Sequence, residues 1–145
     1  MRRPRLSPAI VAAALLCSQA MAGERAVSDA FEEQAVRGKL LFRIHCQSCH
    51  GETARGTGPL AKELMVRPAD LTRIARRDGG DFPGEKIHRA IDGRSAVRAD
   101  GMKEMPVWGL TFQQSGRDAT QETGVDAQID DLVAYLETLQ RPKDR

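Results

Sequence analysis

Two segments of the chain place apolar residues at helical spacing. Residues 28–45 begin with Ser28, a suitable N-cap. Apolar or small side chains then recur every three or four positions, at Phe31, Ala35, Gly38, Leu41 and Phe42. Near the C-terminus the same spacing recurs, with Tyr135 beside it, at Ile129, Leu132, Val133, Leu136 and Leu139. Both patterns predict amphipathic helices. Glycine costs about 1 kcal/mol of helix propensity relative to alanine, so we expect Gly38 to permit close contact between these two helices.

The chain between these helices is divided into short pieces by glycine and proline. The interruptions are Gly51, Gly56, Gly58, Pro59, Pro68, Gly79, Gly80, Pro83 and Gly84. Short helices are predicted over 60–64, 70–77 and 85–92, the last ended by Gly93. No run alternates as a strand does, and no internal repeat is present. The expected fold class is therefore all-α.

The first 22 residues have the three parts of a secretory signal peptide. Three arginines precede the apolar run from Ala9 to Cys17, and Ala20-Met21-Ala22 forms a small-residue cleavage site. The run is too short for the ~20 residues that span a bilayer, which argues against an uncleaved anchor. Leu16 is bulky where lipid-attachment sites carry a small residue, which argues against a lipoprotein. We expect cleavage after about Ala22, export from the cytoplasm, and a mature domain over 23–145.

Composition narrows the class of protein further. Removal of the leader takes away three arginines and no acid, which leaves 19 basic and 20 acidic side chains. A domain so close to neutral, without basic runs interleaved with aromatic residues, gives no indication of nucleic-acid binding. Aromatic residues are scarce, with one Trp, one Tyr and four Phe, so an all-protein core would be thin. A large apolar cofactor would fill it.

The candidate chemistry lies in the run Cys46-Gln47-Ser48-Cys49-His50. This is the C-x-x-C-H haem attachment signature. Two thiols at this spacing form thioethers to the two vinyl groups on one edge of the porphyrin, and His50 is then held beneath the iron as an axial ligand. The sequence predicts one covalent haem.

Other uses of the same cysteines fit less well. A structural zinc site needs four ligands and would have to recruit His45 or His88, because no second cysteine pair exists in the mature chain. A thioredoxin-like dithiol would lie in a βαβ unit, whereas a helical pattern precedes Cys46. A disulfide between Cys46 and Cys49 would close a very small loop and stabilise little.

The mature chain resembles the bacterial class I cytochromes c over nearly its whole length. Beyond the haem signature the resemblance rests on Gly56-Thr57-Gly58-Pro59-Leu60, on Met105-Pro106-Val107-Trp108, and on Gly38, Phe42 and Tyr135, where the family's terminal helices cross. It implies an all-α cytochrome c fold, in which those helices cross and shorter helices and loops wrap one haem.

The resemblance also implies roles for individual residues. The carbonyl of Pro59 would accept the hydrogen bond of His50, Met105 would be the sixth iron ligand, and Trp108 would pack near a haem edge or propionate. Met102 and Met65 compete with Met105, although Met65 suits helix packing. His45 and His88 are further possible ligands.

The implied function is electron transfer rather than catalysis. We expect a monomeric periplasmic carrier that shuttles single electrons between redox protein partners, with no membrane span after leader cleavage. One alternative is a haem subunit of a periplasmic dehydrogenase or oxidase complex, which an exposed apolar patch would favour. Another is a protein with an open sixth site that binds a small ligand.

Overall fold

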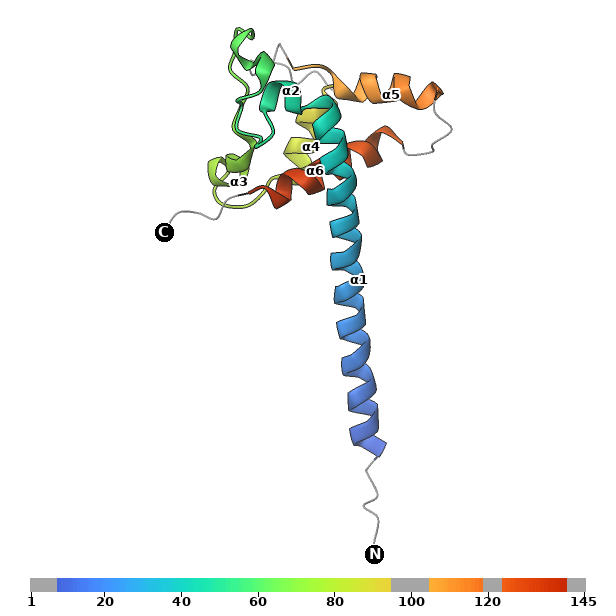
Figure 1. The fold of residues 1–145 in the computed structure, drawn as a ribbon. Coiled ribbons are helices and arrows are strands. Elements are labelled where there is room, and N and C mark those ends of the chain that lie inside the picture. Colours follow the sequence, from blue (N-terminus) through green and yellow to red (C-terminus); the bar gives the residue numbers. More distant parts are fainter. Residues whose placement is uncertain (1–7, 95–104, 119–123, 141–145) are drawn as a thin grey trace, which may run out of the picture. The chain divides into compact units, whose positions relative to one another are not determined.

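All regular elements in the described part of the chain are helices (Figure 1). The computed structural model describes residues 8–94, 105–118 and 124–140. The chain divides into two compact units, residues 1–33 and 34–145. The expected all-α fold class is confirmed.

Helix α1 spans Pro8–His45, so it does not begin at Ser28 as the sequence predicted. The Ser28 hydroxyl donates to the carbonyl of Arg25 at 3.2 Å, a bond inside the helix rather than a cap. Alanine is frequent before Ser28 and no proline follows Pro8 there, so nothing local stops the helix. Of the helices in the described residues, none is both long enough and apolar enough to cross a membrane.

Within residues 34–145, α1 crosses α6 (Val125–Thr138) at Gly38. A Cβ atom on Gly38 would overlap the carbonyl oxygen of Asp131 and lie 2.9 Å from the Cβ of Tyr135, so the crossing requires glycine. The rings of Phe42 and Tyr135 pack beside it with centroids 5.4 Å apart. Arg37 donates two hydrogen bonds to the Asp131 carboxylate, at 2.8 and 2.9 Å. The predicted contact between the terminal helices is confirmed.

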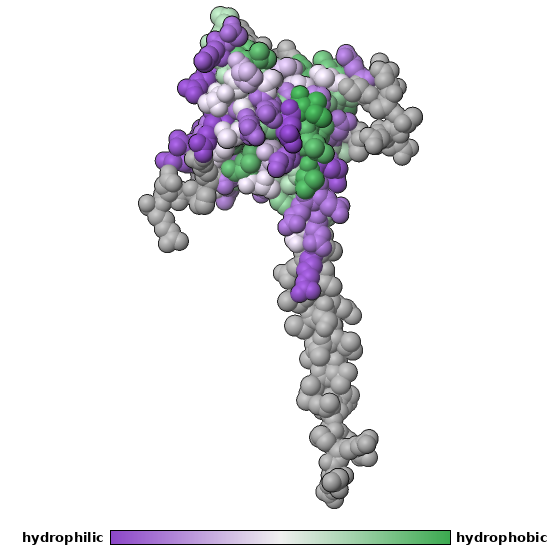
Figure 2. Space-filling view, viewed as in Figure 1, coloured by the Kyte–Doolittle hydropathy of each residue, from purple (hydrophilic) through white to green (hydrophobic). Residues whose placement is uncertain are grey.

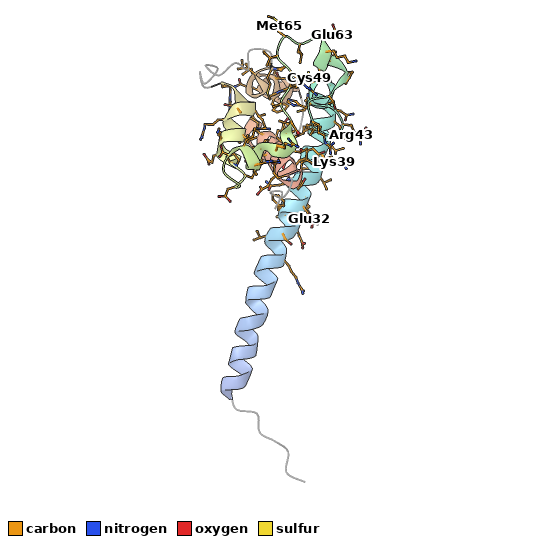
Figure 3. All side chains as sticks on the ribbon, turned by 90° about the vertical axis from the view of Figure 1, so that its left-hand side faces the viewer. Glu32, Lys39, Arg43, Cys49, Glu63 and Met65 are labelled. Carbon is orange, nitrogen blue, oxygen red and sulfur yellow. The ribbon has the colours of Figure 1, made fainter. Side chains whose placement is uncertain are left out.

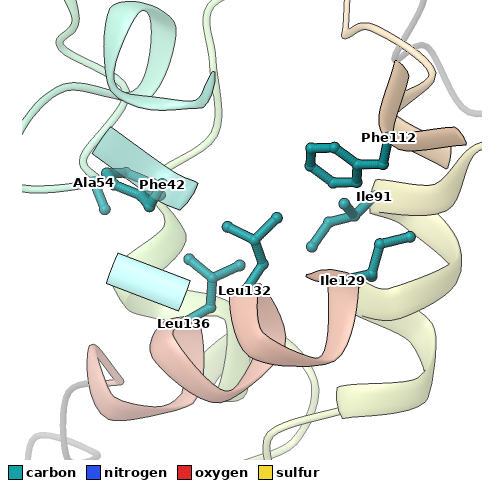
Figure 4. Packing of buried hydrophobic residues seen from close by; sticks show 7 residues of the cluster. All are labelled: Phe42, Ala54, Ile91, Phe112, Ile129, Leu132 and Leu136. Atoms are coloured by element: carbon teal, nitrogen blue, oxygen red, sulfur yellow. The ribbon is translucent and has the colours of Figure 1, made fainter. Parts of the chain in front are cut away.

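The core lies on the inner face of α6. Its largest fully buried side chains are Phe42, Phe112, Ile129 and Leu132. Figure 4 shows three side chains rising from α6 between Phe42 and Ala54 at one end of the cluster and Ile91 and Phe112 at the other. The three are Ile129, Leu132 and Leu136. All three belong to the predicted apolar stripe, so the periodicity identified the buried face of this helix.

Three short helices follow the cysteine motif. A 3₁₀ helix, η1 (Pro59–Lys62), stands in place of the helix predicted over 60–64. A second 3₁₀ helix, η2 (Leu71–Arg73), continues into α3 (Ile74–Arg77), and together they form the helix predicted over 70–77. Asp70 is its N-cap and accepts a hydrogen bond from the amide of Thr72 at 2.9 Å.

Two helices pack against α6 from the later part of the chain. Helix α4 (Gly84–Asp92) ends at Gly93, whose φ of 63° is left-handed, as the sequence predicted. Helix α5 (Trp108–Asp118) was not predicted. The signal in the sequence is the aromatic pair Trp108 and Phe112, one turn apart. The sequence analysis used Trp108 only in the methionine motif and did not use Phe112.

Candidate haem site

The cysteine motif forms a single helical turn directly after α1. Cys46 is the N-cap of α2 (Gln47–His50). The amides of Cys49 and His50 both donate to the carbonyl of Cys46, at 3.2 and 2.9 Å. Residues three apart in such a turn lie on the same face, so the two thiols share one side. Both are half-buried free thiols.

The loop after the motif folds back onto the backbone of the motif. The amide of Gly58 donates to the carbonyl of Cys49 at 3.1 Å, and the amide of Gly56 donates to that of His50 at 2.8 Å. A Cβ atom on Gly58 would lie 2.7 Å from the carbonyl carbon of Cys49, and one on Gly56 would overlap the carbonyl oxygen of Pro68. The two glycines therefore bring the motif and Pro68 together.

His50 is oriented by a backbone carbonyl. Its Nδ1 lies 3.2 Å from the carbonyl oxygen of Ala69. Burial lowers the pKa of His50, and the hydrogen bond to Ala69 offsets only part of this effect. The ring is therefore neutral at neutral pH. When Nδ1 donates to Ala69, Nε2 is the nitrogen that presents its lone pair to a metal.

This carbonyl differs from the one expected. The resemblance gave the acceptor role to Pro59, but Pro59 is exposed and opens η1. Instead, the segment after η1 folds back so that Pro68 contacts Gly56. This contact places the next carbonyl along the chain, that of Ala69, beside the His50 ring. The acceptor is corrected to Ala69. Any other contact of Pro59 with haem stays a prediction.

The thiols and the imidazole fit a covalently attached haem. Burial, and then the charge of the neighbouring Cys49, raise the pKa of Cys46 to about 12, so this group is a neutral thiol. Zinc requires several thiolate or imidazole donors around one point. The described residues contain no group of three or more His, Cys, Asp or Glu side chains arranged for a metal ion. Two unpaired thiols on one face, followed by a neutral imidazole, are the groups that haem attachment uses.

The candidate sixth ligand lies close to the same core. Met105 is half-buried, and like Cys46 and Trp108 it packs against the cluster of buried side chains on α6. Met65 is 94% exposed at the outer end of its loop (Figure 3), so the expectation that it packs on a helix was wrong. Met102 lies outside the described residues. Met105 stays the predicted ligand.

A family model described as cytochrome c matches residues 35–140. The chain belongs to the cytochrome c family. The match begins in the part of α1 that crosses α6, includes the C-x-x-C-H turn, and ends just after α6. No curated protein and no solved structure matches the chain significantly.

Family membership establishes the cofactor and the general activity. This cytochrome c carries covalently bound haem c and transfers electrons, as its family does. Haem c, when bound, supplies a one-electron couple. The chain holds a neutral imidazole at His50 and orients it through the Ala69 carbonyl. Members of the family typically transfer electrons without catalysing a reaction of their own.

Two histidines that could have served as alternative ligands have other neighbours in this cytochrome c. The His45 ring packs edge-on to Trp108 and Phe112, with centroids 5.2 and 5.3 Å away, and burial lowers its pKa. The Nε2 of His88 lies 3.5 Å from a carboxylate oxygen of Asp130. His45 thus links the end of α1 to α5, and His88 links α4 to α6.

Sequence analysis missed Ala69, which contacts His50, and Gln140, which binds the segment after Ala69. Ala69 acts through its backbone, so no side-chain pattern indicates it. Gln140 follows α6 and makes hydrogen bonds to the segment that contains Ala69 and Leu71. A glutamine beyond the last apolar position of a helix resembles any exposed polar residue, so only the folded chain identifies its partners.

Proposed function

We propose that the chain is a periplasmic mono-haem cytochrome c that shuttles single electrons between redox proteins. Cys46 and Cys49 hold the haem through thioethers, and His50 and Met105 are the axial ligands. The observation that carries the proposal is the C-x-x-C-H turn, with two free thiols on one face and a neutral His50 oriented by Ala69. With both axial positions filled, little rearranges when iron changes oxidation state.

The proposal includes processing of the N-terminus. Residues 1–22 are a signal peptide that is cleaved after about Ala22, and 23–145 form a monomeric domain without a membrane span. Its partners dock briefly, through small interfaces. Mass spectrometry of the protein isolated from a periplasmic fraction tests this directly. A haem-bearing chain that begins at Gly23 supports cleavage, and one that retains residue 1 in the membrane fraction contradicts it.

Absorption spectra of the mature protein test the ligands. A low-spin haem that remains attached after denaturation, has a sulfur–iron charge-transfer band in the ferric state and does not respond to carbon monoxide supports Met105 and electron carriage. A high-spin haem that binds carbon monoxide would favour the alternative in which the sixth position is open to a small ligand.

A second candidate function, a haem subunit of a larger redox complex, is favoured by the outer face of α1. Val36, Leu40 and Ile44 recur every four residues and are 63%, 56% and 71% exposed. They form an apolar stripe along the helix that Figure 2 shows in green. Single exposed apolar residues are ordinary, but a contiguous stripe that ends two residues before Cys46 is typical of an interface.

The charges beside the stripe indicate the partner's chemistry. Residues 34–51 contain no Asp or Glu, and Lys39 and Arg43 lie on the same exposed part of α1 (Figure 3). A second copy of this chain would bring like charges together, so the stripe suits an apolar surface rimmed by carboxylates.

Gel filtration of a native extract in mild detergent, monitored at the haem absorption band, separates the two functions. A stable subunit co-elutes with one partner at fixed stoichiometry, and replacement of Val36, Leu40 and Ile44 by serine releases it as a monomer. The control Leu110→Ser changes an apolar residue that is 48% exposed on α5 and should leave elution unchanged. Wild-type protein that elutes as a monomer supports the carrier.

A further inference from the structure

The side-chain amide of Gln140 is bound to the backbone of the η2–α3 segment at two places, Leu71 and Ala75. Its Nε2 donates to the carbonyl of Leu71 at 2.9 Å, and its Oε1 accepts from the amide of Ala75 at 3.0 Å. The same Nε2 donates to the carbonyl of Leu136 in the last turn of α6, at 2.6 Å. One half-buried side chain thus ties the end of α6 to the backbone of residues 71–75.

The opposite side of this segment is tied to the haem-motif loop. The amide of Leu71 donates to the carbonyl of Ala54 at 2.8 Å, and Ala54 is fully buried. Between Ala69 and the helix, the Asp70 carboxylate accepts from both the amide and the hydroxyl of Thr72, at 2.9 and 2.7 Å. The backbone that carries the Ala69 carbonyl is therefore held from both sides, by Ala54 and by Gln140.

We propose that Gln140 is a positioning residue for the haem ligand His50. It fixes the segment 69–75 so that the Ala69 carbonyl stays within hydrogen-bond distance of Nδ1, and in this way it sets the electron-donating strength of the imidazole. The proposal rests on the proposed axial role of His50. Gln140 acts through its two hydrogen bonds to the backbone of this segment, at Leu71 and Ala75.

The expected direction follows from the chemistry of the imidazole. A hydrogen bond from Nδ1 to a carbonyl raises the basicity of the ligating nitrogen, which favours ferric over ferrous iron. Loss of Gln140 lets Ala69 move away from the ring, which makes the imidazole a weaker electron donor. Ferrous iron is then stabilised relative to ferric iron, so the reduction potential rises. We expect the reduction equilibrium to change about threefold, which is about 28 mV for one electron.

The test uses the mature, haem-loaded protein with either of two substitutions at Gln140. Gln140→Met has a similar length and removes all three side-chain hydrogen bonds, those to Leu71, Ala75 and Leu136. Gln140→Glu keeps an acceptor for Ala75 but, as a carboxylate, has no donor for Leu71, so we expect a smaller effect in the same direction. The reduction potential and the solvent exchange of the His50 Nδ1 proton, observed by NMR, are measured for each.

The control variant weakens α6 elsewhere. Asp131→Asn breaks the ion pair with Arg37 at the crossing of α1 and α6 without touching the segment 69–75. It should lower the urea midpoint while the potential and the Nδ1 proton exchange stay at their wild-type values. The potential and the Nδ1 proton exchange are measured without denaturant, well below the urea transition, so that global unfolding does not contribute to the exchange.

The results separate positioning from general stability. A raised potential and faster Nδ1 exchange in Gln140→Met, but not in Asp131→Asn, support the proposal. It is overturned if Gln140→Met only lowers stability, or if both variants shift the His50 readouts equally. Failure of the haem assignment itself is distinguishable, because wild-type protein would then lack the spectrum of a covalent haem.

Discussion

Replacement of Gly38 by alanine tests the crossing of α1 and α6, on which the arrangement of the domain depends. The added Cβ would lie 2.5 Å from the carbonyl carbon of Asp131 and 2.9 Å from the Cβ of Tyr135. Both neighbours are backbone or backbone-proximal atoms on α6, so no side-chain rotation relieves the overlap. The helices must separate instead, by about 1 Å to restore ordinary contact.

Three effects set the magnitude, two destabilising and one stabilising. Overpacking of this kind costs about 1–3 kcal/mol, and loosening of the Phe42–Tyr135 ring pair removes a contact worth about 0.5–1.5 kcal/mol. Alanine has a helix propensity about 1 kcal/mol better than glycine, which offsets part of the loss. We expect a net decrease of about 2 kcal/mol in the free energy of unfolding.

Urea unfolding followed by circular dichroism measures this loss. With a urea dependence of about 2 kcal/mol per molar, the midpoint should fall by about 1 M. Gly84→Ala is the matched control, because its Cβ would lie 3.6 Å from a methyl group of Val133, an ordinary contact, and its midpoint should change little. An unchanged or higher midpoint for Gly38→Ala would refute the reasoning, as would an equal loss in the control.

Three further changes have expected outcomes. Gly58→Ala puts a Cβ 2.7 Å from the carbonyl carbon of Cys49, so the fraction of chains with covalent haem should fall severalfold by haem stain, whereas normal loading would contradict the close packing. Burial lowers the pKa of His45. The unfolded state therefore binds this proton more readily, and the contribution of His45 to stability is present above about pH 6.5 and lost as pH falls. His45→Gln should flatten the decline of the urea midpoint between pH 7 and 5, and an unaltered slope would assign the decline to other groups. Met105→Ala should admit carbon monoxide and lower the reduction potential; if spectrum and potential stay the same, another residue is the ligand.

Local patterns in the sequence predicted most of the helical framework. The stripe of α6 identified its buried face, and Gly93 marked the end of α4 by its left-handed conformation. The start of α1 was wrong because no proline separates the apolar run from Ser28, and Gly23 alone does not end the helix. Helix α5 was missed because the interpretation of its first residues as a ligand motif obscured the spacing of Trp108 and Phe112.

The sequence by itself determined the chemistry, because C-x-x-C-H places two thiols and an imidazole in one helical turn whatever surrounds it. It also identified Gly38 as the contact between the terminal helices. Only the tertiary structure decided which carbonyl orients His50. That acceptor is a backbone atom of Ala69, brought to the ring by a loop that folds back through Gly56, and held by Gln140 from the far end of the chain. Backbone hydrogen bonds between distant segments have no signature in residue types, so the environment of the ligand emerges only when the chain is folded.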